Sequence, residues 1–343
     1  MPAFFQRFLS LCSTFYHWIR LRLQPVSSRV VNYWNRFGDY LRTHPRAKRR
    51  LTIFGPPLFF FFLLLLTVWI ETPSRRQLRN IQNQVASEVY SADSVLLGRY
   101  YIQDRTEVKY NEIAPVVFDA LVATEDNRFY EHEGVDFYSL GRVLVKSIFM
   151  QDESAGGGST LTQQLSKNLY PRKNYWVLSM LINKLREIIT ATRLEGIYSK
   201  QELITMYLNT VPFADNTFGI EAASLRFFSL PADSLSIDQA AVLIGMLKAT
   251  HYYNPRLFPD RSESRRNVVL GQMVKYKYLT KADADSIKQI PLSLNYNKVS
   301  HHHGLAPYFR EYLKTVLMDW CASHEKEDGG PYNLYTDGLK IYT

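Results

Sequence analysis

The stretch GGGSTLTQQLSKN, residues Gly156 to Asn168, joins a glycine loop to the start of a helix. Three consecutive glycines let the backbone approach a ligand closely. Thr160 and Gln163 have capping-box spacing, which predicts a helix whose first amide groups point toward the loop. A helix N-terminus of this kind favours phosphate, and Lys167 and, farther on, Arg172 and Lys173 add positive charge. On spacing alone, a phosphate site and a plain glycine linker before a capped helix are equally compatible with the stretch. It matches neither the P-loop nor the dinucleotide fingerprint, so it implies no nucleotide cofactor.

A second stretch, ATEDNRFYEHEGVD from Ala123 to Asp136, places two adjacent acids at the end of an apolar helix. Pro115 fits the first turn of that helix. Glu125 lies at the rim of the apolar surface, where partial desolvation suits a carboxyl group to act as a general base.

A third stretch, Asn183 to Glu187, lies inside a helix expected from about Trp176 to Tyr198. Lys184 and Glu187 are three residues apart and therefore share one face of that helix. Taken alone, this spacing describes an ordinary surface ion pair that stabilises the helix by about 0.2–0.5 kcal/mol.

Together the three stretches resemble, in order and in wording, the signature blocks of glycosyltransferase family 51, the peptidoglycan glycosyltransferase domain of class A penicillin-binding proteins. The third block resembles the family's RK-x-x-E pattern, with Asn183 where the family usually has Arg. The second is similar to the pattern GGST-x-TQQL-x-KN throughout residues 157–168. The first resembles ED-x-x-F-x-x-H-x-G-x-D, which is met at Glu125, Asp126, Phe129, His132, Gly134 and Asp136.

Two further segments extend the resemblance, which covers the chain from Val89 to Lys288. YSKQELITMYLNTVPF, which starts at Tyr198, is similar to the family's K-x-E-I-L-x-x-Y-L-N helix. Ser199 and Glu202 have capping-box spacing, which predicts that a helix opens here. A later segment with Arg265, Arg266 and Met273 resembles R-R-x-x-V-L-x-x-M.

The resemblance implies a mainly α, lysozyme-like helical domain that polymerises lipid II into β-1,4 glycan and releases undecaprenyl pyrophosphate. It implies that Glu125 is the base, that Glu187 is a second catalytic carboxylate, and that the reaction inverts the anomeric carbon. Mg²⁺ is the expected cofactor, near Glu187 or Asp126. The residues expected to bind sugar or phosphate are Asp126, Phe129, His132, Ser159, Thr160, Gln163, Gln164, Lys167, Asn168 and Lys184.

A membrane anchor is expected from Leu51 to Ile70, twenty residues without a charge. Such a helix spans about 30 Å, the thickness of a bilayer core. The basic residues up to Arg50 predict a cytoplasmic N-terminus and an extracytoplasmic body, a single-pass type II protein of the bacterial inner membrane. Pro56 and Pro57 are expected in the first turns of the helix. Residues 4–19 fit either an interfacial amphipathic helix or a loosely ordered tail.

Composition excludes two other classes of protein. The net charge is +9, and residues 1–50 carry all of it, with ten Arg and Lys against one acid. A nucleic-acid-binding protein would need that positive charge on its folded body. The two cysteines, Cys12 and Cys321, cannot form a disulfide scaffold or a cysteine-based zinc module.

The expected organisation begins with a basic cytoplasmic tail (1–50), the anchor (51–70), and a stalk with a short β segment (71–110). The glycosyltransferase domain (111–288) and a linker (289–343) follow. Residues 336–343 resemble the start of the linker before a transpeptidase domain, so we expect a truncated bifunctional family member. Residues 137–150 lie where the family has a membrane-dipping jaw, and their apolar side chains face lipid or the core. His301–His303 are left without a role.

Two alternative functions stay open. A membrane-anchored peptidoglycan hydrolase or lytic transglycosylase could also use one Glu, but it would not need the glycine loop with Lys167 and Lys184. An inactive cell-wall scaffold is disfavoured by the presence of both Glu125 and Glu187. The expected partners are lipid II, the growing glycan strand, the bilayer and other cell-wall synthesis proteins.

Overall fold

The computed structural model describes residues 35–36, 39–40, 42–81, 83–145, 158–297, 306–326 and 329–343. The N-terminal helix expected at residues 4–19, Gly156, Gly157 and His301–His303 lie outside these ranges. The chain divides into two compact units, with the boundary between Trp69 and Ile70. Each unit is described by itself below.

The described part of the first unit consists mainly of α3 (Pro45–Glu71), whose last two residues belong to the second unit. Most of the large apolar side chains of α3 are exposed. Among the described residues, this is the one helix long and apolar enough to cross a membrane. It begins before Leu51, so Pro56 and Pro57 lie in its interior and not in its first turns. Each proline removes a backbone N–H donor from the helix ladder.

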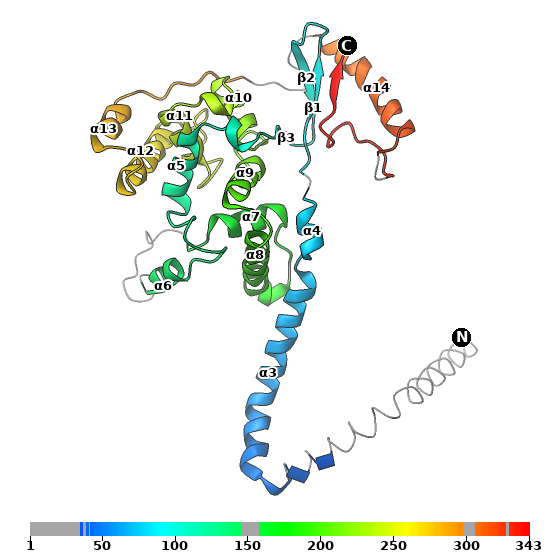
Figure 1. The fold of residues 1–343 in the computed structure, drawn as a ribbon, viewed down its shortest axis with the longest axis vertical. Coiled ribbons are helices and arrows are strands. Elements are labelled where there is room, and N and C mark those ends of the chain that lie inside the picture. The colour runs from blue at the N-terminus through cyan, green and yellow to red at the C-terminus, as the bar shows by residue number, and fades with distance from the viewer. Residues whose placement is uncertain are drawn as a thin grey trace, which may run out of the picture. The chain divides into compact units, whose positions relative to one another are not determined.

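The second unit is built mainly from helices, which confirms the expected mainly α fold (Figure 1). Its central helix is α5 (Pro115–Glu125), in which Val117, Leu121 and their neighbours are buried. Pro115 occupies the first turn of α5, as predicted. The other helices of the body are α7 (Leu161–Leu169), α8 (Ser179–Glu195), α9 (Lys200–Thr210), α10 (Ile220–Phe228), α11 (Ile237–Met246), α12 (Pro259–Lys275) and α13 (Lys281–Lys288).

Two groups of helices position the candidate site. α5 packs against α11 and α12, whereas α7 packs against α8 and α9. α9 begins with a capping box between Ser199 and Glu202, as predicted. α8 begins at Ser179, three residues later than expected, because Trp176–Leu178 form a separate 3-10 turn, η3. Short turns η1 (Tyr110–Glu112) and η4 (Ala232–Ser234) complete this part of the body.

A small sheet combines strands from the beginning and from the end of the second unit's sequence. β1 (Ser87–Tyr90) and β2 (Leu96–Tyr100) form a hairpin within the expected short β segment, and β5 (Lys340–Tyr342) pairs in parallel with β1 (Figure 1). The sheet and α14 (Pro307–Ser323) share a second apolar cluster that contains Val89 and Cys321. Parts of the expected stalk and the expected linker therefore pack together. A two-residue parallel pair, β3 (Asp104–Arg105) with β4 (Thr217–Phe218), lies elsewhere in the unit.

The helix α4 (Arg75–Arg79) follows α3, and α6 (Phe137–Val145) follows the first signature block. Phe137 and Tyr138 at the start of α6 are exposed. The sequence left two environments open for this segment, lipid and the protein core. These two side chains do not lie in the core. Residues 146–150 lie outside the described part of the chain.

Candidate active site

Asp126 joins the end of α5 to the start of α7. Its carboxylate is buried, and Oδ2 accepts the Leu161 backbone N–H at 2.9 Å. Oδ2 also lies 3.0 Å from His132 Nε2. The Leu161 N–H belongs to the first turn of α7, where backbone donors lack partners inside the helix. A carboxylate at this end of a helix is also favoured by the helix dipole.

Gly134 makes a second connection between the first block and α7. Its carbonyl oxygen accepts the Thr160 hydroxyl at 2.7 Å and the Gln163 side-chain amide at 3.4 Å. Gly134 has φ of 85°, and a Cβ there would lie 2.9 Å from the carbonyl carbon of Ala191 in α8. Only glycine suits this backbone conformation and this close approach.

Thr160 caps α7 as predicted, because its hydroxyl accepts the Gln163 N–H at 3.2 Å. The second half of the expected capping box is absent from the described contacts. The Gln163 side chain bonds to Gly134 and to Lys184 instead of returning to the Thr160 backbone. Gln163, which predicted a capping box by its residue type, therefore makes its side-chain contacts within the candidate site instead.

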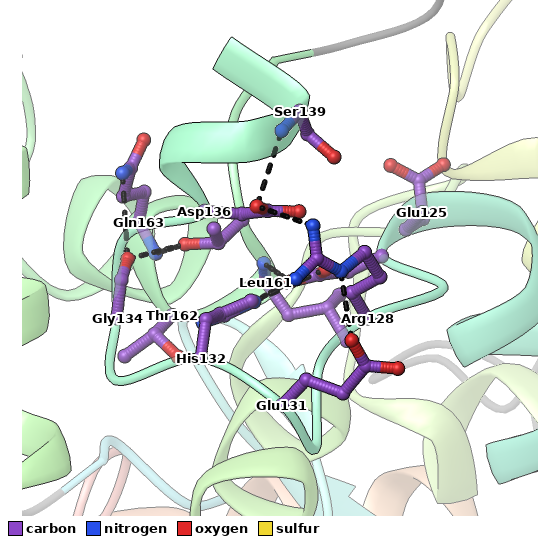
Figure 2. Close-up of polar contacts among 12 residues, drawn as sticks. Glu125, Arg128, Glu131, His132, Gly134, Asp136, Ser139, Leu161, Thr162 and Gln163 are labelled. Carbon is purple, nitrogen blue, oxygen red and sulfur yellow. Dashed lines mark hydrogen bonds and ion pairs between the residues drawn. The ribbon is translucent and has the colours of Figure 1, made fainter. Parts of the chain in front are cut away.

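Arg128 orders the loop after α5, as Figure 2 shows. Its guanidinium donates to Glu131 at 2.8 Å and to Asp136 at 3.3 Å, and it stacks over the Tyr138 ring at 4.7 Å. Asp136 in turn accepts the N–H groups of Tyr138 and Ser139 and so caps α6. The start of α6 is thereby fixed to the loop.

Glu125, the expected base, is partly exposed and contacts α7. Gln164 donates its side-chain amide to Glu125 Oε2 at 2.9 Å. The amide oxygen of Gln164, Oε1, accepts the Tyr207 hydroxyl at 3.1 Å. Tyr207 is fully buried, and burial, followed by the nearby charge of Glu125, raises its pKa well above the usual value. Tyr207 therefore stays a donor and fixes which end of the Gln164 amide faces Glu125.

Lys184 and Glu187 lie in a cluster of charged groups that contacts the start of α7 through Ser159 and Gln163. Lys184 Nζ donates to Ser159 Oγ at 2.7 Å and to Gln163 Oε1 at 2.8 Å, and lies 3.5 Å from Glu187. Glu187 is buried, and its second oxygen accepts Arg172 Nε at 2.8 Å. The interpretation as a plain surface ion pair is therefore wrong. A buried carboxylate between two cations is a stronger structural feature, since a buried charge must be paired.

Arg172 is the functional candidate that sequence reasoning valued too little, since it entered only as added positive charge. Asn183, at the position where the family usually has Arg, is buried and holds the backbone of Lys173. Its side chain accepts the Lys173 N–H at 3.1 Å and donates to the Lys173 carbonyl at 2.7 Å. The loop that Asn183 holds also carries Arg172 to Glu187. Local spacing gave no signal for this contact, because it joins a loop residue to a helix residue fifteen positions later.

Several expected substrate-binding residues build the site and do not line it. Phe129 is fully buried, with Lys200 Nζ 4.4 Å from its ring centre. The same Lys200 donates to the His132 carbonyl at 2.6 Å and pairs with Glu195. His132, like Asp126, is buried within the protein. In this structure these side chains contact protein atoms and support the loop that follows Glu125.

Lys167 and Asn168 are not brought to the Lys184 cluster by any described contact. They line a separate cavity of ≈ 670 Å³, together with residues that include Gln77, Arg105 and Tyr170. Lys167 is exposed and lies one turn beyond Gln163 on α7.

The expected magnesium positions, Glu187 and Asp126, do not belong to a described cluster of three ligands. Among the described residues, no three His, Cys, Asp or Glu side chains lie close enough together to hold an ion. Glu187 pairs with Lys184 and Arg172, and Asp126 bonds to His132 and Leu161. Both carboxylates have protein partners in this arrangement, and magnesium at either position stays a prediction.

Comparison with known proteins gives a consistent result. Residues 93–274 match the family described as Transglycosylase. Penicillin-binding protein 1A of Escherichia coli (strain K12) is 32% identical over 268 residues, which are 78% of this chain and 30% of that protein. Penicillin-binding protein 1F of Bacillus subtilis (strain 168) is 34% identical over 234 residues, which are 68% of this chain and 32% of that protein. The chain thus spans about a third of the length of these curated relatives.

Among solved structures, penicillin-binding protein 1A from Haemophilus influenzae matches 76% of this chain and 27% of that chain. The sequence identity is 22% and the TM-score is 0.42.

Replacing Gly134 tests how tightly the first block is held against α8. We expect Gly134→Ala to destabilise the protein, because a left-handed φ costs about 1–2 kcal/mol in an L-residue and overpacking adds about 1–3 kcal/mol. The control is Gly271→Ala in α12, where a Cβ meets no atom within 4 Å. That change should stabilise the helix by up to about 1 kcal/mol. Thermal unfolding of the purified full chain measures both, and equal midpoints for the two variants would contradict the expectation.

Proposed function

Because the chain belongs to the transglycosylase family of peptidoglycan glycosyltransferases, we propose that its helical body polymerises lipid II in bacterial cell-wall synthesis. The reaction joins disaccharide units into a β-1,4 glycan strand and releases undecaprenyl pyrophosphate. The observation that carries the proposal is the placement of Gln163 and Gln164, which are neighbours on α7. One binds the Lys184 ammonium and the other binds the Glu125 carboxylate. Two adjacent residues of α7 thus contact the proposed base and one of the proposed cations.

Glu125 takes the proton of the attacking sugar hydroxyl in this proposal. The hydroxyl oxygen forms a bond to the anomeric carbon as the bond from that carbon to the pyrophosphate oxygen breaks. A sugar hydroxyl is a weak nucleophile, so a positioned base contributes a large part of the acceleration. Gln164 holds Glu125 Oε2 through its amide, and Tyr207 orients that amide. The hydroxyl attacks the face of the sugar ring opposite the departing pyrophosphate, so this single displacement inverts the anomeric carbon.

The leaving pyrophosphate needs charge neutralisation, because it departs as an anion that is already a weak base. Lys184 and Arg172 are the cations proposed to supply it, with Ser159 beside Lys184. Preorganised cations aimed at developing charge give large transition-state stabilisation. Glu187 holds both cations and is proposed to orient them rather than to move a proton. We keep Mg²⁺ as a proposal in which pyrophosphate oxygens and water supply its ligands, in accord with the preferences of this ion.

The substrate class also accounts for the apolar helix α3. A lipid-linked sugar keeps its pyrophosphate at the membrane surface, so an enzyme that uses it benefits from an anchor. We propose a single-pass type II protein of the bacterial inner membrane, with the basic residues that precede Leu51 in the cytoplasm. Other cell-wall synthesis proteins are proposed partners of the anchored enzyme.

Glu125→Gln tests the reaction type. We expect glycan formation from lipid II to fall by about 10²–10⁴-fold, the usual contribution of a general base. Glu133→Gln is the control, because Glu133 is an exposed carboxylate of the same loop. Products are resolved by length after incubation of the full chain with lipid II in detergent. Full activity of Glu125→Gln would refute its role, and shortening of finished glycan by the unmodified protein would indicate the hydrolase.

Arg172→Ala tests the second cation that pairs with Glu187. Loss of a charge-assisted hydrogen bond worth about 1.5–3 kcal/mol should lower kcat/KM by about tenfold to a hundredfold. Arg172→Lys should recover part of the rate, since the charge remains without the two-pronged geometry. Lys314→Ala, which removes an exposed ion pair with Glu311 on α14, should leave the rate unchanged. Unchanged kcat/KM in Arg172→Ala would show that Arg172 serves the fold alone.

A further inference from the structure

An exposed apolar segment lies between the loop that carries Arg172 and the helix that carries Lys184. We name residues 176–181 (WVLSML) the Trp176 tip. Trp176 is 88% exposed and Met180 is 83% exposed, and Val177, Leu178 and Leu181 are also exposed. Five large apolar side chains that no described part of the chain covers form an unusual surface for a protein that contacts only water.

The tip is a defined structure rather than a frayed end. Trp176 has φ of 54°, a left-handed conformation that is strained for a bulky residue. Asn174 Oδ1 accepts the Trp176 N–H at 2.9 Å and the Ser179 hydroxyl at 3.1 Å. Ser179 Oγ accepts the Tyr175 N–H at 2.7 Å. The polar groups of the turn thus bond among themselves, and the apolar side chains point outward.

The tip is connected to the residue at which the uncharged run of α3 ends. Lys173 Nζ lies 2.6 Å from Glu71 Oε2, and the Tyr175 hydroxyl donates to the same oxygen at 3.1 Å. From α8, Arg186 donates to the Glu71 carbonyl at 3.3 Å. Glu71 directly follows Ile70, so in an anchored protein it marks the edge of the hydrocarbon layer. The residues that precede the tip therefore lie at the level of the lipid headgroups.

We propose that the Trp176 tip inserts into the outer leaflet of the bilayer, beside the point where α3 leaves it. The inference rests on the membrane anchoring in the proposed function. Tryptophan favours the boundary between lipid tails and headgroups, and cations such as Lys173 and Arg172 favour anionic headgroups. The partner of this surface is thus lipid, and the segment is separate from the α6 region.

Insertion of the tip would set the height of the cation cluster above the membrane. Along α8, Lys184 and Glu187 follow Met180 by four and seven residues, which correspond to about 6 and 10 Å of helix axis. A pyrophosphate attached to a lipid lies within that distance of the hydrocarbon edge. The tip would thereby hold Lys184 at the depth of the leaving group.

Site-directed spin labelling of the full chain in phosphatidylethanolamine/phosphatidylglycerol nanodiscs tests the proposal without any substrate. Labels are placed by Met180→Cys, by Phe60→Cys in α3, and by Tyr312→Cys on α14, whose side chain is 71% exposed. The background protein carries Cys12→Ser and keeps the buried Cys321. This background protein, without an introduced cysteine, is treated with the label as a blank and shows how far Cys321 reacts. Power saturation compares access of oxygen, which enters lipid, with access of a water-soluble nickel chelate.

We expect the label at position 180 to favour oxygen, as at position 60, and the label at position 312 to favour nickel. A label at position 180 that favours nickel while position 60 favours oxygen would overturn the proposal and leave the anchor intact. A label at position 180 reached by neither reagent would also overturn it, because protein would then cover the tip. A failed activity assay would leave these readouts unchanged, so the two proposals fail separately.

Discussion

The arrangement of the candidate active site depends on the carboxylate of Asp126. Glu125 ends one buried helix, α5, whereas Gln163 and Gln164 lie on another, α7, and 35 residues separate Asp126 from its partner Leu161. Asp126 connects the two by accepting the first free N–H of α7. A buried carboxylate is costly unless hydrogen bonds satisfy it, so the bonds from Leu161 and His132 stabilise one relative position of the two helices. Glu125 on α5, the proposed base, is thereby placed against the Gln164 amide of α7.

Buried carboxylates paired with partly exposed cations continue this design. Glu187 is enclosed by Lys184 and Arg172, and Lys200 connects Glu195 to the loop at His132. Loss of its cations would leave a carboxylate buried and unpaired, which is strongly destabilising. In the proposed reaction the cations are already oriented when the anionic leaving group forms. Preorganisation of this kind is where most electrostatic catalysis originates.

The sequence allowed the prediction of those features that depend on local spacing. Pro115 and the Ser199 capping box were predicted from a few neighbouring residues, and the family patterns indicated which residues of the blocks belong to one site. Contacts between distant segments could not be predicted from spacing. Arg172 reaches Glu187 from a loop that Asn183 holds, Tyr207 orients Gln164 from 43 residues away, and β5 pairs with β1 across most of the chain. The burial of Phe129 and His132 likewise follows from tertiary packing, so their supporting role emerged only from the structure.

The most direct measurement of the central claim is hydrogen exchange at the Leu161 amide, in the unmodified chain and in Asp126→Ala. If Asp126 holds the start of α7, loss of that hydrogen bond should accelerate exchange at Leu161 by about tenfold or more, while the buried amides of α11 keep their protection. Asp119→Ala, on the same helix α5, serves as the control and should leave Leu161 unchanged. Equal protection of Leu161 with and without the Asp126 carboxylate would contradict the account.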